Sequence, residues 1–270
     1  MGRHQLHHAV IAPPQPDPWL RNAIRSASPA GLRVAVALGR RAWRDSRLAG
    51  ARARLTSGLP SGPAADFPCV VLEVLQDIKP SAFFEGKLAN IALGAKRLDG
   101  VVVAPGEVLS FWKLVGRPSA VAGFEIGRSI RGAAAGADVG GGLCQLSGIA
   151  YEAGLRAGLE PVERHPHSRD LYAEEERFTP LGLDATLVWP YKDLRLANPL
   201  PVPVQLRFAV QGMSVSASVH APLPIDPAML ELERVDHDGW REVRVLRRTS
   251  GGEAELVSHD RYAALEVGAA

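Results

Sequence analysis

Cysteine, aromatic residues and net charge are all scarce in this sequence of 270 residues. Its two cysteines, Cys69 and Cys144, are too few for a disulfide framework, although a single bridge between them stays open. Aromatic residues make up 6% of the chain, the formal net charge is +2, and no basic run carries interleaved aromatic residues, which argues against nucleic-acid binding. The 46% of hydrophobic residues suits one large globular domain, alone or with an irregular extension.

A long hydrophobic run is also lacking. The longest apolar stretch near the start, residues 31–39, is short and contains Arg33, so no integral membrane segment is expected. Arg40 and Arg41 follow this stretch, whereas a secretory signal has its basic residues before the apolar part. From the sequence alone we therefore expect a cytoplasmic protein.

The composition divides the chain into four segments. Residues 1–30 are rich in His, Pro and Arg without periodicity and are expected to form a poorly ordered tail. Residues 31–80 are expected to be a helical N-terminal extension with a Gly- and Pro-rich linker, and residues 81–221 the main domain. Residues 222–270 are expected to form a β-rich C-terminal extension packed on that domain.

The main domain is expected to begin with a helix over residues 83–98, capped by Ser81. A second helix is predicted over residues 143–157, and several strands, including residues 183–189, follow it. Helices come first and strands dominate later, which predicts an α+β fold. In this fold N-terminal helices precede a mainly antiparallel mixed sheet, packed with a central helix that begins near Cys144.

A glycine turn, Gly140-Gly141-Gly142, leads into Leu143-Cys144-Gln145 at the start of the second predicted helix. Glycines free the backbone to present N–H groups to an anion, and the amino end of a helix adds unpaired donors and a positive dipole. A cysteine there is expected to have a lowered pKa, and the same donors can stabilise an oxyanion. The alternative is a core cysteine beside glycines that serve only close packing, and spacing alone does not separate the two.

A thiol nucleophile needs a basic partner, and the nearest dense polar cluster is Glu163-Arg164-His165-Pro166-His167-Ser168. Because His165 and His167 are two residues apart in an extended stretch, they point to opposite faces, so only one readily reaches the site. No further ligand motif accompanies the two histidines, so neither a metal nor another cofactor is expected.

Two further polar residues have both a functional and a structural interpretation. Asp184 can orient a histidine, or serve only as a turn or strand-edge residue. Arg164 can hold a substrate carboxylate in bidentate fashion, or form a structural ion pair with Glu163 or Asp170.

Together these motifs resemble the VanW family, which is named for a gene product that accompanies vancomycin resistance. The resemblance runs from about Lys87 to Phe208, within the segment 81–221, which we interpret as a VanW-like domain. It is carried by Pro105-Gly106-Glu107, by residues 140–147, 163–168 and 183–186, and by Lys192-Asp193-Leu194 and Asn198. The family pattern has one histidine before the serine, and this histidine corresponds to His167.

Some members of the family are described as L,D-transpeptidases that act on peptidoglycan, and the resemblance implies the same chemistry. Cys144 would take an acyl group from a tetrapeptide stem and pass it to an amine of a second stem. His167 would shuttle the proton and Asp184 would orient His167. The expected substrate contacts are Gly141, Gly142, Gln145, Arg164, His165 and Ser168. The resemblance also implies an association with the cell envelope.

The alternative is a non-catalytic accessory module of the cell wall or of antibiotic resistance. Such a module would hold a carboxylate or phosphate ligand at the turn from Gly140 to Cys144, with Arg164 as a clamp.

Overall fold

The computed structural model describes residues 30–50, 54–55, 66–131, 134–170 and 177–264. The chain divides into two compact units, Met1–Trp43 and Arg44–Ala270. Helix α2 (Ala30–Gly50) lies within the segment that was expected to be helical, whereas residues 1–29 of the expected tail lie outside the described residues. None of the described helices is both long and apolar enough to cross a membrane.

Two long helices and all of the described strands fall in the second unit. Its helices are α3 (Phe84–Leu98), α4 (Phe111–Val115), the 3-10 turn η2 (Ala120–Ala122) and α5 (Leu143–Arg156). Its strands are β1 (Arg54–Leu55), β2 (Cys69–Asp77), β3 (Val101–Val103), β4 (Glu107–Ser110), β5 (Ile126–Arg131), β6 (Ala134–Val139), β7 (Glu160–Glu163), β8 (Arg195–Ala197), β9 (Val204–Gln211), β10 (Ser214–Ala221), β11 (Met229–His237), β12 (Trp240–Arg248) and β13 (Glu255–Ala263). The predicted helices over 83–98 and 143–157 are confirmed as α3 and α5.

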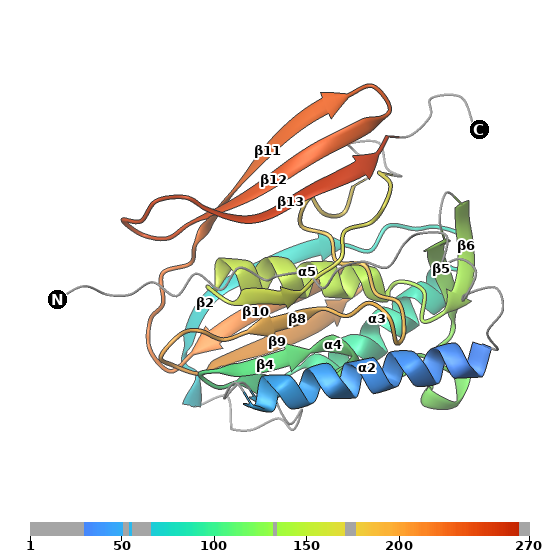
Figure 1. Cartoon of the computed structure of the whole chain (residues 1–270), viewed down its shortest axis with the longest axis horizontal. Helices are drawn as coiled ribbons and strands as arrows, with labels where there is room; N and C mark the ends of the chain where they lie inside the picture. The colour runs from blue at the N-terminus through green and yellow to red at the C-terminus, as the bar shows by residue number, and fades with distance from the viewer. Residues whose placement is uncertain (1–29, 51–53, 56–65, 132–133, 171–176, 265–270) are drawn as a thin grey trace. The chain divides into compact units, whose positions relative to one another are not determined.

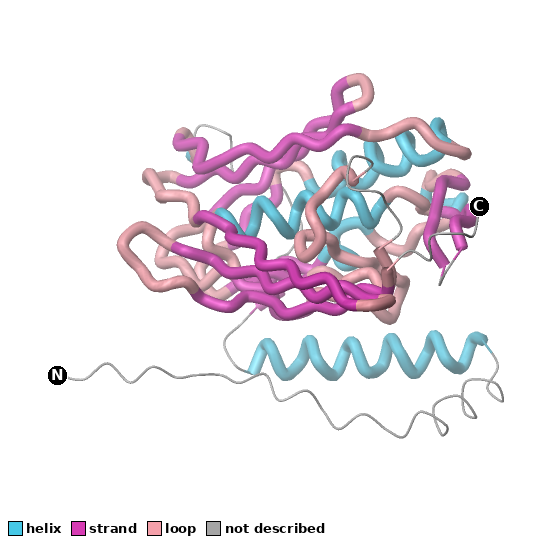
Figure 2. The backbone as a smooth tube through the Cα atoms, turned by 90° about the horizontal axis from the view of Figure 1, so that it is seen from above, coloured by secondary structure: helices cyan, strands magenta, loops and turns pink. Residues whose placement is uncertain are grey.

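The strands form several small sheets instead of the one mixed sheet that was expected. Two four-stranded sheets have the orders β1-β4-β8-β7 and β2-β10-β9-β3, a three-stranded sheet has the order β11-β12-β13, and β5 pairs with β6. Pairing is antiparallel throughout the described strands except between β1 and β4. The α+β fold class is confirmed, and the strand-rich character of the second unit is visible in Figures 1 and 2.

Strand β2 corrects the expectation for residues 31–80. These residues were expected to be a helical extension and a linker, but Cys69–Asp77 is a nine-residue strand. It pairs with β10 from Cys69↔Ala221 to Asp77↔Ser214 and so belongs to the same sheet as β9 and β3. Its β-branched and aliphatic residues suit a half-buried strand better than a linker. The domain limits at residues 81 and 221 stay a prediction.

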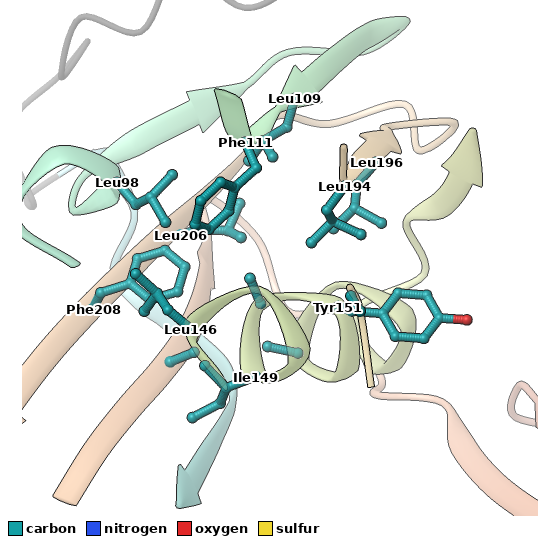
Figure 3. Close-up of a cluster of buried hydrophobic side chains, with 14 of the residues drawn as sticks. Leu98, Leu109, Phe111, Leu146, Ile149, Tyr151, Leu194, Leu196, Leu206 and Phe208 are labelled. Atoms are coloured by element: carbon teal, nitrogen blue, oxygen red, sulfur yellow. The ribbon is translucent and has the colours of Figure 1, made fainter. Parts of the chain in front are cut away.

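Helix α5 is the central element of the core. It packs against α3, β2, β10 and β7. Leu146 and Ile149 on α5 are fully buried, as are Phe111 and Leu206 in the same hydrophobic cluster, which Figure 3 shows around the helix. Burial of each such side chain contributes about 1.5–3 kcal/mol. The helix is therefore held firmly, and so is Cys144 in its first turn.

Two local expectations are wrong. The residue that precedes α3 is Phe83, which has a left-handed conformation at φ 61° and makes no side-chain cap, so Ser81 does not cap the helix. Residues 183–189 form no strand; they are a loop with one isolated bridge, Val188↔Lys192. Leu183, Ala185 and Leu187 are nevertheless buried, as is Asp184 between them. This loop packs against the core, and side chains of other elements bond its backbone.

The end of the C-terminal sheet lies against the loop that follows β7. The N–H of Ala263 donates to the carbonyl of Ser168 at 3.0 Å, and the N–H of Asp170 donates to the carbonyl of Ala263 at 2.9 Å. Asp170 is buried and forms ion pairs with Arg177 and Arg241, the latter in β12. These contacts bring β13 beside the polar cluster of residues 163–168.

Candidate active site

The glycine turn before α5 is packed tightly against β5. A Cβ on Gly141 would lie 2.2 Å from the carbonyl oxygen of Gly127, so no other residue fits there. The N–H of Gly141 donates to the carbonyl of Asp138 at 3.0 Å, and its carbonyl accepts from Nδ2 of Asn90 at 2.9 Å. Gly142 precedes the helix at φ 103°, a conformation that favours glycine. Part of the glycine run therefore serves close packing, as the structural interpretation of the turn expected.

Cys144 lies in the first turn of α5 and is partly exposed. Its sulfur accepts a hydrogen bond from the N–H of Leu187 at 3.4 Å. In the described part of the chain, the N–H groups of Gly142 and Cys144 donate to no acceptor. Both cysteines are free, so the bridge between Cys69 and Cys144 is not formed. Cys144 is thus partly accessible to solvent, its sulfur accepts a hydrogen bond from a backbone amide, and unpaired N–H groups lie beside it at the amino end of the helix.

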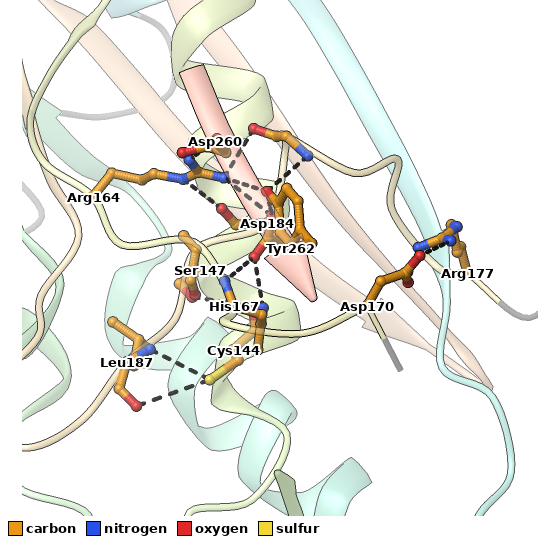
Figure 4. Close-up of polar contacts among 12 residues, drawn as sticks. Cys144, Ser147, Arg164, His167, Asp170, Arg177, Asp184, Leu187, Asp260 and Tyr262 are labelled. Carbon is orange, nitrogen blue, oxygen red and sulfur yellow. Dashed lines mark hydrogen bonds and ion pairs between the residues drawn. The ribbon is translucent and has the colours of Figure 1, made fainter. Parts of the chain in front are cut away.

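His167 lies beside Cys144 and is held by Asp184 (Figure 4). Its Nδ1 is 2.6 Å from Oδ2 of Asp184, and its backbone N–H donates to the same oxygen at 2.7 Å. Burial alone would lower the pKa of His167, but hydrogen bonds and charge interactions with Asp184 and Cys144 outweigh burial and raise it to about 10. The imidazole is therefore protonated at neutral pH.

Asp184 is buried within a network of donors. Arg164 donates from Nη2 to Oδ1 of Asp184 at 3.0 Å and from Nε to its backbone carbonyl at 2.7 Å, and the hydroxyl of Tyr262 donates to Oδ1 at 2.6 Å. Burial raises the pKa of Asp184, but the hydrogen bond from His167 and the charge of Arg164 overcome it and hold the pKa well below its usual range. Asp184 is thus a fixed carboxylate that orients His167 and favours its charged form.

Arg164 is not placed to bind a substrate, contrary to expectation. Its side chain is 5% exposed, and besides Asp184 it pairs with Asp260 and donates to the carbonyl of Gly182. Its guanidinium also lies 5.1 Å from the centre of the Tyr151 ring. All three guanidinium nitrogens are bonded inside the protein. Arg164 forms ion pairs with Asp184 and Asp260, instead of with Glu163 or Asp170.

Tyr262 and Asp260 are the members of this network that the sequence analysis missed. Both come from β13, and Tyr262 is fully buried, with its oxygen accepting from the N–H of Gly182 at 3.0 Å. No motif surrounds them, and 78 residues separate Tyr262 from Asp184 along the chain. Only the packing of the C-terminal sheet brings them to the site.

Most of the other expected substrate contacts have polar groups that are already bonded within the protein. Gln145 is buried, and its Nε2 donates to the carbonyl of Asp77 at 2.9 Å. His165 faces away from Cys144 toward Glu163, with Nε2 3.2 Å from Oε1, so the expectation that only one histidine reaches the site agrees with the geometry. Ser168 is exposed and bonds β13 through its carbonyl. Of these residues, Gly142 keeps an open N–H beside Cys144.

No group of three or more His, Cys, Asp or Glu side chains suited to a metal ion occurs among the described residues. Cys144, His167 and Asp184 bring together the side chains of a thiol, an imidazole and a carboxylate. Such a series can perform nucleophilic acyl transfer.

Comparison with known proteins assigns the family. Residues 86–220, which contain Cys144, His167 and Asp184, match the family described as VanW like protein. The chain belongs to the VanW family. Asp260 and Tyr262 lie beyond the matched region of this VanW-family chain.

Two relatives share the VanW region. The uncharacterized protein YoaR of Bacillus subtilis (strain 168) is 34% identical over 132 residues, which cover 49% of this chain and 42% of that protein. The vancomycin B-type resistance protein VanW of Enterococcus faecalis (strain ATCC 700802 / V583) is 28% identical over 137 residues, 51% of this chain and 50% of that protein. The chain therefore spans about half the length of these curated relatives. No solved structure matches it.

Proposed function

We propose that this VanW-family protein is a cysteine-dependent acyl-transfer enzyme, a transpeptidase or an amide hydrolase. The observation that carries the proposal is the series Cys144, His167 and Asp184: Nδ1 of His167 lies 2.6 Å from Oδ2 of Asp184, and the interaction with Cys144 is one cause of the raised pKa of His167. In known acyl-transfer enzymes, a histidine activates a weak nucleophile and a carboxylate orients the histidine. Cys144, His167 and Asp184 have the side chains for these three roles.

The reaction follows from the charges of these groups. The sulfur of Cys144, as a thiolate beside the imidazolium of His167, attacks the carbonyl carbon of an amide. The C–N bond breaks, and His167 gives its proton to the leaving amine nitrogen, which leaves a thioester on Cys144. An acceptor amine then attacks the thioester carbonyl, gives a proton to His167 and releases the thiolate; water in its place gives hydrolysis.

The oxyanion of each tetrahedral intermediate needs donors. The N–H of Cys144 is open at the amino end of α5, where the helix dipole adds positive charge. Gln145, which was expected to help here, donates to Asp77 in β2 and positions that strand instead. We assign the oxyanion contact to the N–H of Cys144.

We infer the substrate class from the family resemblance. Peptidoglycan stem peptides supply both an amide and an acceptor amine, and their use implies work at the cell envelope instead of the cytoplasmic location that the sequence alone favoured. The non-catalytic alternative relied on Arg164 as an anion clamp, and the internal bonds of Arg164 remove that support.

Alkylation of Cys144 tests the nucleophile. In a Cys69→Ser background, we would measure the rate of reaction with iodoacetamide from pH 5 to pH 9. An ordinary thiol with a pKa of about 8.5 is about 0.3% thiolate at pH 6, so a paired thiolate should react at pH 6 at least tenfold faster than free cysteine. His167→Ala should abolish this excess, whereas the matched control His165→Ala should keep it. A rate at pH 6 equal to that of free cysteine would refute the proposal.

A product assay tests the reaction itself. A tetrapeptide stem and an amine acceptor would be incubated with the protein, and cross-linked and hydrolysed products measured by mass spectrometry. Cys144→Ala should form neither product. If Cys144 reacts as above but the wild type forms no product from this donor, the substrate assignment is wrong and the nucleophile assignment stands.

A further inference from the structure

Lys87 is a buried cation that the mechanism above does not use. It lies in the second turn of α3, one turn after Phe83, and is 9% exposed. Its side chain runs along the glycine turn, because a Cβ on Gly142 would lie 2.8 Å from Cγ of Lys87. Its Nζ is 5.8 Å from the centre of the Phe178 ring. Lys87 therefore lies beside the residue that precedes α5, two positions before Cys144.

The ammonium group of Lys87 has no counter-ion in the described part of the chain. No hydrogen bond or ion pair joins its Nζ to any described residue, and its polar surroundings include a second cation, Arg128. Burial, helped by the charge of Arg128, lowers the pKa of Lys87 to about 8. The charge of Arg128 disfavours the ammonium form of Lys87, so an anion beside Lys87 would stabilise that form.

The amino end of α5, which the aliphatic part of the Lys87 side chain contacts, adds hydrogen-bond donors. The helix has 14 residues, and the N–H of Gly142 has no acceptor among the described residues. Unpaired N–H groups and the positive end of the helix dipole bind carboxylates and phosphates. The lysine and the helix end are independent features, and each suits an anion.

We propose that Lys87 and the N–H of Gly142 together bind a carboxylate of the acyl donor beside Cys144. This inference rests on the proposed function and gives its substrate class: a peptide with a free carboxylate next to the scissile amide. Lys87 takes the role that the sequence analysis gave to Arg164. The N–H of Cys144 is left for the oxyanion, so the two negative groups have separate donors.

Two alkylating reagents of nearly equal size test the proposal without knowledge of the substrate. Iodoacetate carries a carboxylate and iodoacetamide does not, so the ratio of their rates at Cys144 measures attraction of the carboxylate. In the Cys69→Ser background at pH 7 and low salt, Lys87→Met should lower the iodoacetate-to-iodoacetamide ratio about tenfold, the effect of one charge-assisted hydrogen bond. Lys113→Met, which removes an exposed lysine of α4, should leave the ratio unchanged.

The outcomes separate this inference from the proposed function. An unchanged ratio in Lys87→Met, with iodoacetamide still reacting in a His167-dependent way, would overturn the carboxylate site and leave the nucleophile intact. If Lys87→Met fails to fold, protection of Cys144 by acetate decides. In the wild type, acetate should slow the reaction with iodoacetate more than the reaction with iodoacetamide. In the folded Lys87→Gln variant this difference should be smaller. Stronger protection of the wild type by inorganic phosphate than by acetate would show a phosphate site and refute the assignment to a carboxylate.

Discussion

Replacement of Tyr262 by phenylalanine removes one oxygen from the network around Asp184. That oxygen is fully buried; it donates to Oδ1 of Asp184 at 2.6 Å and accepts from the N–H of Gly182 at 3.0 Å. A hydrogen bond to a charged group contributes about 1.5–3 kcal/mol, and a buried donor without a partner costs about 1–3 kcal/mol. Because Arg164 still holds Asp184, we expect Tyr262→Phe to lower the free energy of unfolding by about 2–4 kcal/mol.

The same change should affect the reactivity of Cys144 less than the stability. The hydrogen bond from Tyr262 is one cause of the low pKa of Asp184, so its loss raises that pKa. Arg164 and His167 remain in contact with the carboxylate, and Asp184 therefore stays ionised at pH 7. We expect the alkylation rate to fall less than tenfold in Tyr262→Phe and much further in Asp184→Asn, which removes the charge that favours imidazolium.

Urea denaturation at pH 7 measures the first effect and iodoacetamide the second. Tyr191→Phe is the matched control, since Tyr191 is 45% exposed and its hydroxyl bonds no described residue. If Tyr262→Phe unfolds at the same urea concentration as Tyr191→Phe, the hydroxyl does not hold Asp184 and the argument fails.

Three more variants follow from the same structure. The pKa of His167 is about 10 in the folded chain and about 6.5 in the unfolded chain. The stability that its protonation contributes is therefore complete below pH 6.5 and is lost as the pH rises toward 10. Urea unfolding of the wild type at pH 6 and pH 9 should show this loss, and an equal loss in His167→Ala would contradict it. Gly141→Ala should destabilise the fold by about 1–3 kcal/mol, because its Cβ would meet the Gly127 carbonyl; Gly136→Ala, whose Cβ would have only an ordinary contact with Oγ of Ser129 at 3.9 Å, is a control for the loss of a glycine. Arg164→Met leaves Asp184 and Asp260 buried without their shared cation, for which about 3–5 kcal/mol of lost stability is expected; a variant as stable as the wild type in thermal denaturation would show that the ion pairs contribute nothing.

Local patterns were enough to predict the parts of the site that lie within one element. The spacing of the glycines and Cys144 marked the amino end of α5, and the two-residue spacing of His165 and His167 predicted opposite faces, which the bonds to Glu163 and Asp184 match. These features depend on chain geometry over a few residues, so the sequence contains them.

Local sequence patterns could not predict the contacts between residues that are far apart in the sequence. The loop of residues 183–189 has the alternation of a strand, but its backbone is bonded by Arg164, Ser147 and the sulfur of Cys144 instead of by a neighbouring strand. Alternation of apolar and polar residues in a sequence indicates which side chains are buried, but it does not indicate which groups form hydrogen bonds with the backbone. In the same way, Asp260 reaches Arg164 across 96 residues through the register of β13, which depends on all of its pairs with β12.

The C-terminal sheet supplies a negative charge, that of Asp260, to the network around Asp184. If Arg164 were paired with Asp184 alone, its full positive charge would offset the carboxylate and weaken the attraction of Asp184 for imidazolium. Asp260 also pairs with Arg164, so that the guanidinium is shared and Asp184 keeps negative charge for His167. Transfer of a proton from Cys144 to His167 then moves charge within the network without changing its total. The VanW-matched region, residues 86–220, contains Cys144, His167 and Asp184, whereas Asp260 and Tyr262, which bond Arg164 and Asp184, lie outside that region.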